Sequence, residues 1–201
     1  MHLGLRTLVL IDAQNMYRGA RRAFFGDGLA SSRDGQYHPR AFAELLTARH
    51  PAGRAPSRLA EVRIYTGRPD GYISPKGHAA NVRQCQAWER SGATVYQRPL
   101  QYINGQRPTE KGIDIAIAVD LVVAGYSGSF DRAIVCSADT DLIPAIEAVL
   151  DHGGIQVEVA GWREGQYGQR IWIPGRDLPC HWLYRDNYEA IHDTTDYKLA
   201  P

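Results

Sequence analysis

The chain has 201 residues, of which 44% are hydrophobic and 22% are charged, and its net charge is +1. This length allows one sizeable core and is short for two, so we expect a single domain over residues 1–201. No apolar run is long enough to cross a membrane, and the three cysteines are widely spaced, so we expect a soluble protein of the reducing cytoplasm.

Strand-like and helix-like segments alternate along the chain. Apolar, β-prone runs are separated by segments whose apolar residues recur at helical spacing. In chain order we expect strand 7–11, helix 15–25, a short helix 39–48, strand 62–66, helix 79–91, strand 94–98, helix 112–125, strand 132–137, helix 141–151, strand 155–161 and helix 183–193. The alternation predicts an α/β fold with a parallel sheet and helices on both faces.

Some segments carry more specific expectations. Helix 112–125 is almost wholly apolar, as expected for a helix buried against a sheet. Asp141 is a candidate N-cap for the helix that follows it. Residues 26–58 are expected to form a long loop around the short helix, and "DYKLAP" (196–201) is expected to be a frayed tail.

Four aspartates lie at one predicted edge of the sheet. One follows strand 7–11, two follow strand 132–137, and one lies in the first turn of helix 112–125. These residues are Asp12, Asp139, Asp141 and Asp114, respectively. Ligands of open parallel sheets bind at the carboxyl ends of the strands, so we expect the four carboxylates to meet in one cleft.

Such a cluster needs compensation, because two unit charges about 4 Å apart repel by roughly 4 kcal/mol at an effective dielectric constant near 20. Divalent cations neutralise several carboxylates at once, and oxygen ligands favour Mg²⁺ or Mn²⁺ over zinc. Taken singly, Asp141 could be only a helix cap, Asp114 only a partner of the helix dipole, and Asp12 only a strand terminator. Asp120 points to another side of its helix, where a structural or solvent-facing role is expected.

Three blocks of sequence carry a resemblance to a known family. They are "LVLIDAQNMY" (8–17), "KGIDIAIAVDLV" (111–122) and "AIVCSADTDLIPAIEAVLDHGGIQVEVAG" (133–161). Together they resemble the NYN domain, a branch of the PIN-like nuclease superfamily. The blocks place the core of the domain at about residues 7–161 and leave residues 162–201 as a C-terminal extension.

The resemblance implies a three-layer α/β/α fold with a parallel sheet of about five strands in the order 3-2-1-4-5. It also implies a Mg²⁺- or Mn²⁺-dependent ribonuclease, in which metal-activated water attacks the phosphodiester in line. Asp12 looks like the acid after the first strand, Asn15 like its orienting partner, and Asp114 like the acid of the K-x-x-D motif. Asp139 and Asp141 look like the acidic pair after the fourth strand, and which acid accepts the proton stays open. Lys111 and Ser137 match positions that contact phosphate and support the metal ligands.

Basic residues suggest where RNA, or DNA as a second candidate, would bind. Residues 1–110 carry 16 basic residues against 8 acidic ones, whereas residues 111–201 carry 7 against 14. A polyanion partner would explain this polarity, and an uneven scatter of solvated charges would explain it equally well. Two groups are candidate contacts, each with an ordinary surface role as the alternative. They are Arg18, Arg21 and Arg22 on helix 15–25, and Arg68, Lys76 and His78, with Tyr72 as a base-stacking aromatic, in "RPDGYISPKGH" (68–78).

Other functions fit the sequence less well. A phosphatase of the haloacid dehalogenase type needs a second aspartate two residues after the first, and this chain has Gln14 there. No G-x-G-x-x-G follows the first strand, and no H-E-x-x-H is present. The remaining alternative is an NYN-like module that binds RNA or a protein and keeps its acids for metal-assisted folding. A homodimer is compatible with either function.

Overall fold

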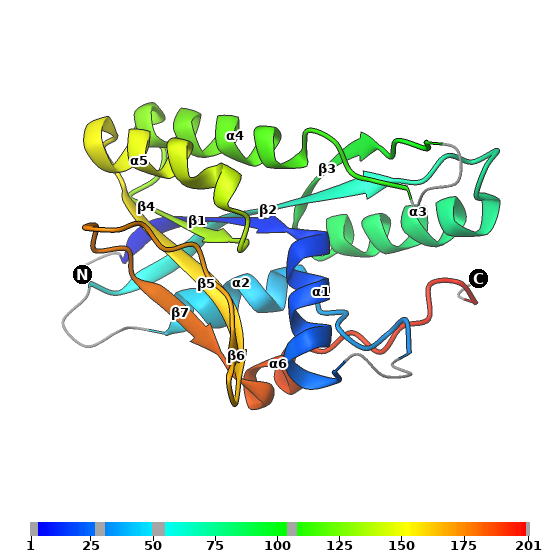
Figure 1. The fold of residues 1–201 in the computed structure, drawn as a ribbon. Helices are drawn as coiled ribbons and strands as arrows, with labels where there is room; N and C mark the ends of the chain where they lie inside the picture. Colours follow the sequence, from blue (N-terminus) through cyan, green and yellow to red (C-terminus); the bar gives the residue numbers. More distant parts are fainter. Residues whose placement is uncertain (1–3, 27–30, 50–54, 104–107, 200–201) are drawn as a thin grey trace.

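The structure is a computed structural model that describes residues 4–26, 31–49, 55–103 and 108–199 (Figure 1). The five predicted strands are present as β1 (Leu5–Asp12), β2 (Ser57–Arg68), β3 (Thr94–Pro99), β4 (Arg132–Cys136) and β5 (Gln156–Glu164). The predicted helices are present as α1 (Ala13–Phe24), α2 (Pro39–Ala48), α3 (Pro75–Arg90), α4 (Ile113–Ser127), α5 (Ile143–His152) and α6 (Arg185–Ile191). Part of the predicted loop 26–58 lies outside the described residues, and its last two residues belong to β2.

The strands form one mostly parallel sheet in the order β3-β2-β1-β4-β5-β6. The predicted order of the first five strands, 3-2-1-4-5, is confirmed. Two short strands extend the sheet beyond the prediction: β6 (Tyr167–Gly168) is antiparallel to β5, and β7 (Cys180–Leu183) is parallel to it. At the centre, Ile11 of β1 lies beside Ile64 of β2 and Cys136 of β4. The carboxyl ends of these three strands therefore share one edge.

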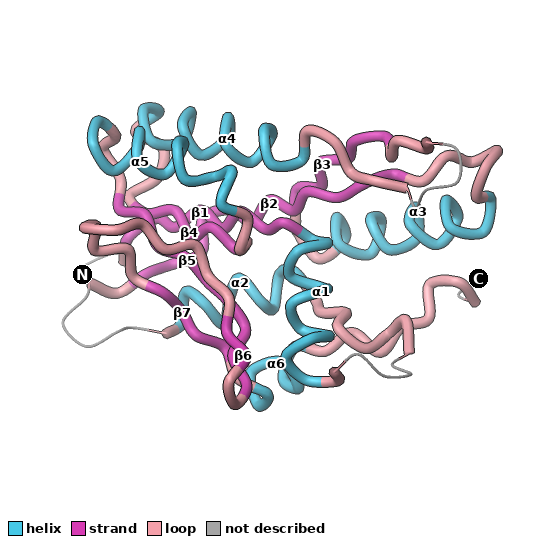
Figure 2. The backbone as a smooth tube through the Cα atoms, in the orientation of Figure 1, coloured by secondary structure: helices cyan, strands magenta, loops and turns pink. Residues whose placement is uncertain are grey.

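Helices cover both faces of the sheet, which gives three layers (Figure 2). Successive side chains of β1 point to opposite faces, because a strand alternates with a period of two. Val9 and Ile11 pack in the cluster that includes α1, α2 and α3, whereas Leu8 and Leu10 pack in the cluster that includes α4 and α5. All four side chains are fully buried, as expected for a central strand with helices on both sides.

The joint between β4 and α5 differs from the prediction. A short 3₁₀ turn, Thr140–Leu142, lies between the strand and the helix, and α5 begins at Ile143. Asp139 is the N-cap of this turn, and its carboxylate accepts a hydrogen bond from the Asp141 N–H at 3.0 Å. The prediction that Asp141 caps the helix is therefore wrong, because the added turn moves the cap two residues upstream.

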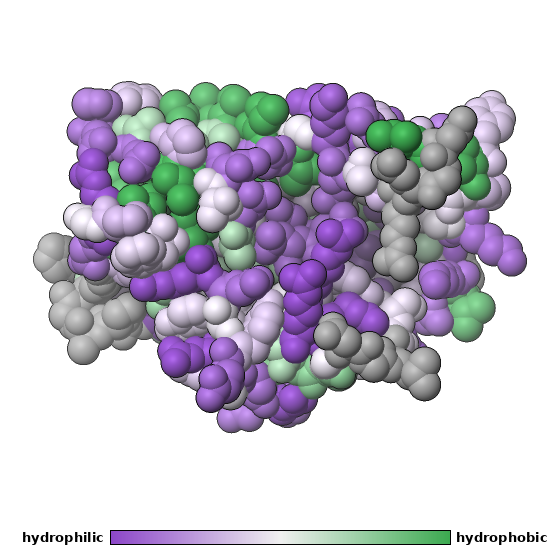
Figure 3. Space-filling view, viewed as in Figure 1, coloured by the Kyte–Doolittle hydropathy of each residue, from purple (hydrophilic) through white to green (hydrophobic). Residues whose placement is uncertain are grey.

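Helix α4 covers the sheet with only one of its faces. Ile117 and Leu121 are fully buried against the sheet, whereas Ile115 and Val119 are 64% and 54% exposed. Figure 3 shows the hydrophobic side chains that gather along this helix at the upper left. The prediction of a buried helix is right for one face and wrong for the other, because no described residue covers the outer side.

The end of the chain is held against the rest of the molecule. Arg83 of α3 donates two hydrogen bonds to the Tyr197 carbonyl, at 2.9 and 2.7 Å. Tyr197 is buried, and its hydroxyl donates to Asp193 at 2.7 Å. Just upstream, His192 forms an isolated antiparallel bridge with Tyr37. The prediction of a frayed tail is therefore wrong at Tyr197.

The segment after residue 161 also contributes to the core. Trp162 is buried, and its Nε1 donates a hydrogen bond to the Met16 carbonyl at 2.9 Å. The Trp162 ring lies against Phe24, Phe42 and Tyr188.

We keep as a proposal that residues 1–201 form a single domain. No helix in the described part of the chain is long and apolar enough to span a membrane.

Candidate active site

Asp12 lies at the joint between β1 and α1. It is the N-cap of α1, and its Oδ1 accepts a hydrogen bond from the Asn15 N–H at 2.9 Å. The Ser137 hydroxyl donates to Oδ2 at 3.4 Å. Burial, opposed by these hydrogen bonds and assisted by the charge of Asp139, raises the pKa of Asp12 to about 6. An ionised Asp12 therefore lacks full compensation from the protein.

Hydrogen bonds connect Asp12 to the end of β4. The Asn15 Oδ1 accepts from the Ala138 N–H at 3.0 Å, and the Ser137 Oγ accepts from the Asp139 N–H at 3.1 Å. The Asn15 contact joins the first turn of α1 to the segment after β4, whereas the Ser137–Asp139 contact lies within that segment. Asn15 and Ser137 therefore each contact both Asp12 and the segment that carries Asp139.

A third carboxylate, Glu110, lies near Asp12. Its Oε1 accepts a hydrogen bond from the Gly67 N–H at 2.5 Å. With the Gln14 amide turned so that its NH₂ faces this carboxylate, Gln14 donates to Oε2 at 2.9 Å and accepts from Arg18 at 2.9 Å. Burial, opposed by the Gly67 hydrogen bond and assisted by the charge of Asp12, raises the pKa of Glu110 to about 6. Sequence reasoning did not single out Glu110, although it directly precedes the "KGID" motif.

These carboxylates share a pocket of about 210 Å³ that we call the acidic pocket. Its lining residues are Asp12, Gln14, Asn15, Arg18, Gly19, Arg22, Glu110, Asp139 and Gln169. Two of the three predicted arginines of α1 therefore lie beside the acids. The third, Arg21, instead donates hydrogen bonds to the Tyr17 hydroxyl at 3.1 Å and to the Asp34 carbonyl at 3.0 Å.

Other predicted site residues lie outside the lining of the acidic pocket. Asp114 is half-buried in the first turn of α4, while Lys111 and Asp141 are exposed. Asp120 accepts a hydrogen bond from the Tyr65 hydroxyl and pairs with Arg63 at 3.2 Å, which confirms its structural role. The structure thus brings Asp12 and Asp139 together with Glu110, rather than all four predicted aspartates.

The second group of predicted nucleic-acid contacts spans the end of β2 at Arg68, the turn that follows it, and the start of α3 at Pro75. Arg68 and Lys76 are exposed, and neither lines the acidic pocket. His78 lies within α3, and its Nδ1 is 2.8 Å from the Pro69 carbonyl oxygen, a contact that holds the turn before the helix. Tyr72 is 98% exposed.

Comparison with known proteins places this arrangement in a family. Residues 6–169 match the NYN domain. The chain belongs to the NYN domain family. NYN domains have a PIN-like, nuclease-type fold and are generally ribonuclease-like, so the family and fold predicted from the three sequence blocks are confirmed.

One solved structure is similar to this NYN domain protein over most of both chains. It is a protein of unknown function from Vibrio parahaemolyticus, 19% identical, with a TM-score of 0.55. The similarity covers 83% of this chain and 88% of that chain. At this identity the likeness concerns the fold alone. No curated protein matches the chain.

The donor chemistry of this NYN domain fits a hard divalent cation. Asp12, Asp139 and Glu110 offer carboxylate oxygens, which Mg²⁺ and Mn²⁺ prefer. Within the described residues no group of three His, Cys, Asp or Glu side chains is arranged to hold a metal ion. Mg²⁺ usually keeps several waters and binds through one or two carboxylates, so the pair Asp12 and Asp139 would suffice.

Proposed function

We propose that this NYN domain protein hydrolyses phosphodiester bonds of RNA, with Mg²⁺ or Mn²⁺ in the acidic pocket. The observation that carries the proposal is the convergence of Asp12, Glu110 and Asp139 beside Arg18 and Arg22. Carboxylates alone would repel a phosphate, and arginines alone would bind one without cleaving it. With both in one pocket, the acids would hold a cation and the arginines would hold an RNA backbone.

Each side chain has a role in this proposal. Asp12 and Asp139 hold the cation, while Asn15 and Ser137 orient them through the hydrogen bonds described above. A divalent cation bound here supplies charge neutralisation at the phosphate and activation of the attacking water. Glu110, with Oε1 fixed by the Gly67 N–H, accepts the proton of that water.

The family resemblance also implies roles for Asp114, Asp141 and Lys111. We keep these residues in the proposal without direct contact to the cation. Mg²⁺ keeps part of its water shell in proteins, so a carboxylate can act on the ion through a bound water. We assign Asp114 and Asp141 to such outer positions and Lys111 to the phosphate of the substrate. RNA is the proposed partner and DNA the second candidate, while a cytoplasmic location and a homodimer stay predictions from the sequence.

A cleavage assay with matched variants tests the proposal. Structured and single-stranded RNA are incubated with the protein and Mn²⁺, Mg²⁺ or EDTA. We expect cleavage that needs the cation and that falls by about 100-fold or more in Asp12→Asn and Asp139→Asn, because each variant removes a charged ligand. Asp151→Asn is the control, since Asp151 pairs with Arg176 away from the acidic pocket. Cleavage that persists in both site variants would contradict the proposal.

A second candidate function is an RNA-binding module without hydrolysis. One observation favours this function: within the described residues, no group of three His, Cys, Asp or Glu side chains is arranged so that it could hold a metal ion. This function predicts RNA binding and no product with any of the cations. The two candidates therefore give opposite results in the same cleavage assay.

A further inference from the structure

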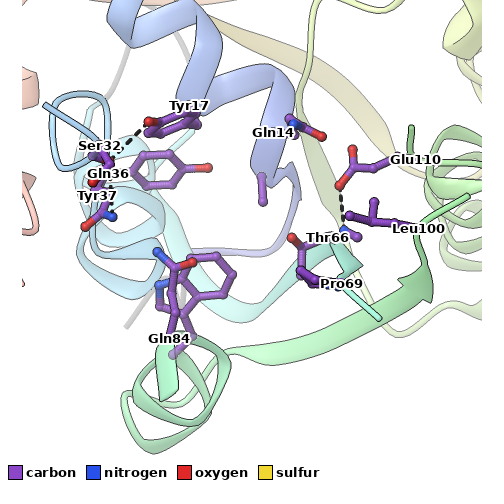
Figure 4. Close-up of a pocket in the computed structure, with 13 residues that line it drawn as sticks. Gln14, Tyr17, Ser32, Gln36, Tyr37, Thr66, Pro69, Gln84, Leu100 and Glu110 are labelled. Atoms are coloured by element: carbon purple, nitrogen blue, oxygen red, sulfur yellow. Dashed lines mark hydrogen bonds between the residues drawn. The ribbon is translucent and has the colours of Figure 1, made fainter. Parts of the chain in front are cut away.

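A second cavity, of about 300 Å³, adjoins the acidic pocket, and we call it the aromatic cavity. Gln14 and Glu110 line both spaces and form the wall between them. The other residues that line the aromatic cavity come from α1, from the segment before α2, from the end of β2, from α3 and from the segment after β3. Figure 4 shows Tyr17, Gln36 and Tyr37 on one side and Gln14, Thr66 and Glu110 on the other.

Three residues that line this cavity each carry a buried polar atom without a hydrogen-bond partner among the described residues. These atoms are the Gln36 Oε1, the Tyr37 hydroxyl and the Trp88 Nε1. Tyr37 is only 4% exposed and Trp88 only 7% exposed, and the Tyr37 hydroxyl points into the open space of Figure 4. Orphaned polar groups destabilise a fold, and native proteins contain few of them. Three around one cavity indicate that a ligand supplies the partners.

The lining defines the chemistry of that ligand. Tyr17, Tyr37 and Trp88 provide aromatic surface. The indole N–H is a donor, the amide oxygen is an acceptor, and the tyrosine hydroxyl can be either. Among the described lining residues Glu110 alone carries a charge, so the cavity suits a neutral ring better than a phosphate. A flat heterocycle with donors and acceptors along one edge meets these requirements, and a nucleobase is such a group.

We propose that the aromatic cavity binds one unstacked nucleobase of an RNA strand whose backbone lies in the acidic pocket. This inference rests on the proposed function, because it takes the adjoining pocket to hold the phosphodiester. The shared wall of Gln14 and Glu110 puts the base site directly beside the phosphate site. The protein therefore needs a single-stranded nucleotide at this position and cuts at a fixed distance from it.

Binding to RNA with single abasic positions tests the base site without any cleavage. A labelled single-stranded RNA is titrated by fluorescence anisotropy in EDTA, with one nucleotide at a time replaced by an abasic residue. We expect replacement at one position to weaken binding by about tenfold, since aromatic stacking and edge hydrogen bonds to that base are lost. Replacement at other positions should change the affinity by less than about twofold.

Two conservative variants then connect the effect to the cavity. Tyr37→Phe and Trp88→Phe each remove one orphaned polar atom, and each should reduce the abasic penalty by about three- to tenfold. Because the Tyr37 hydroxyl has no partner to lose, the Tm of Tyr37→Phe should equal or exceed that of the natural protein. Tyr126→Phe and Trp172→Phe are the controls, since both residues are more than half exposed elsewhere.

The outcomes separate this inference from the proposed function. Base-dependent binding that disappears in Tyr37→Phe and Trp88→Phe supports the base site, even if no cleavage occurs with Mn²⁺, in which case only the ribonuclease proposal fails. Cleavage without any abasic effect overturns the base site and leaves a solvent-filled cavity. An abasic effect that stays undiminished in both variants also overturns it, because the base would then be held elsewhere.

Discussion

At the scale of single residues, Asp12 is a buried acid whose ionisation is opposed by its surroundings. Burial, together with the charge of Asp139, raises its pKa from 3.8 to about 6. A carboxyl whose pKa is higher in the folded state binds an extra proton on folding. Its contribution to stability is therefore complete below pH 3.8 and is lost as the pH rises through about 6. At neutral pH, ionised Asp12 destabilises the metal-free protein.

Asp12→Asn should therefore stabilise the metal-free protein at pH 7.5, by on the order of 2–3 kcal/mol. The amide keeps an oxygen for the Asn15 N–H and removes the charge. Urea unfolding in EDTA at pH 5 and pH 7.5 checks this, and the gain should be much smaller at pH 5, where Asp12 is already largely protonated. Mn²⁺ should stabilise the natural protein at pH 7.5 and leave the variant unchanged. If Asp12→Asn were less stable than the natural protein at pH 7.5, this would show that ionised Asp12 does not destabilise the metal-free protein.

At the scale of elements, the strands and helices could be predicted because each has its own periodic signal in the sequence. The joints between strands and helices could not be predicted in the same way. The 3₁₀ turn before α5 makes Asp139 rather than Asp141 the N-cap, and the sequence is compatible with either residue as the cap. Glu110 was missed because its approach to Asp12 depends on a hydrogen bond to Gly67, 43 residues away. The convergence of Asp12 and Asp139 was predictable, because both follow neighbouring parallel strands.

The end of β2 sets the position of Glu110, so Gly67→Ala should impair the site. An added Cβ would overlap Leu100 and would lie 2.8 Å from the Glu110 Oε1. We expect the shifted carboxylate to reduce RNA cleavage by about 10- to 100-fold, since a displacement of about 1 Å can have this effect on catalysis. The control is Gly71→Ala, whose Cβ would meet only His78 at an ordinary distance of 3.7 Å. Equal activity of the two variants would argue against a role for Glu110.

At the scale of the whole molecule, the basic and acidic halves of the sequence meet in the sheet. β1, from the basic half, lies beside β4, from the acidic half. The acidic pocket takes Asp12, Glu110, Arg18 and Arg22 from the first half and Asp139 from the second. The charge polarity of the sequence therefore does not divide the protein into two bodies.

The part of the chain that matches the NYN domain is shorter than the part that contributes buried side chains to the core. The likeness ends at residue 169, yet buried side chains continue beyond it. These are Ile171, Ile173, Leu178, Leu183, Tyr188 and Ile191. Each buried side chain of this size contributes about 1.5–3 kcal/mol, so their joint loss rivals the roughly 5–15 kcal/mol that stabilises a typical domain.

A protein cut at the similarity boundary should consequently fail to fold. We expect residues 1–169 to lack a cooperative thermal transition by circular dichroism, whereas residues 1–199 should melt like the full chain. The shorter protein also lacks His192 and therefore the backbone bridge between His192 and Tyr37. This bridge supports Tyr37, whose hydroxyl lacks a hydrogen-bond partner among the described residues of the aromatic cavity. A protein trimmed to the residues that match the family would thus keep the carboxylates of the site and lose the residues that hold the site in place.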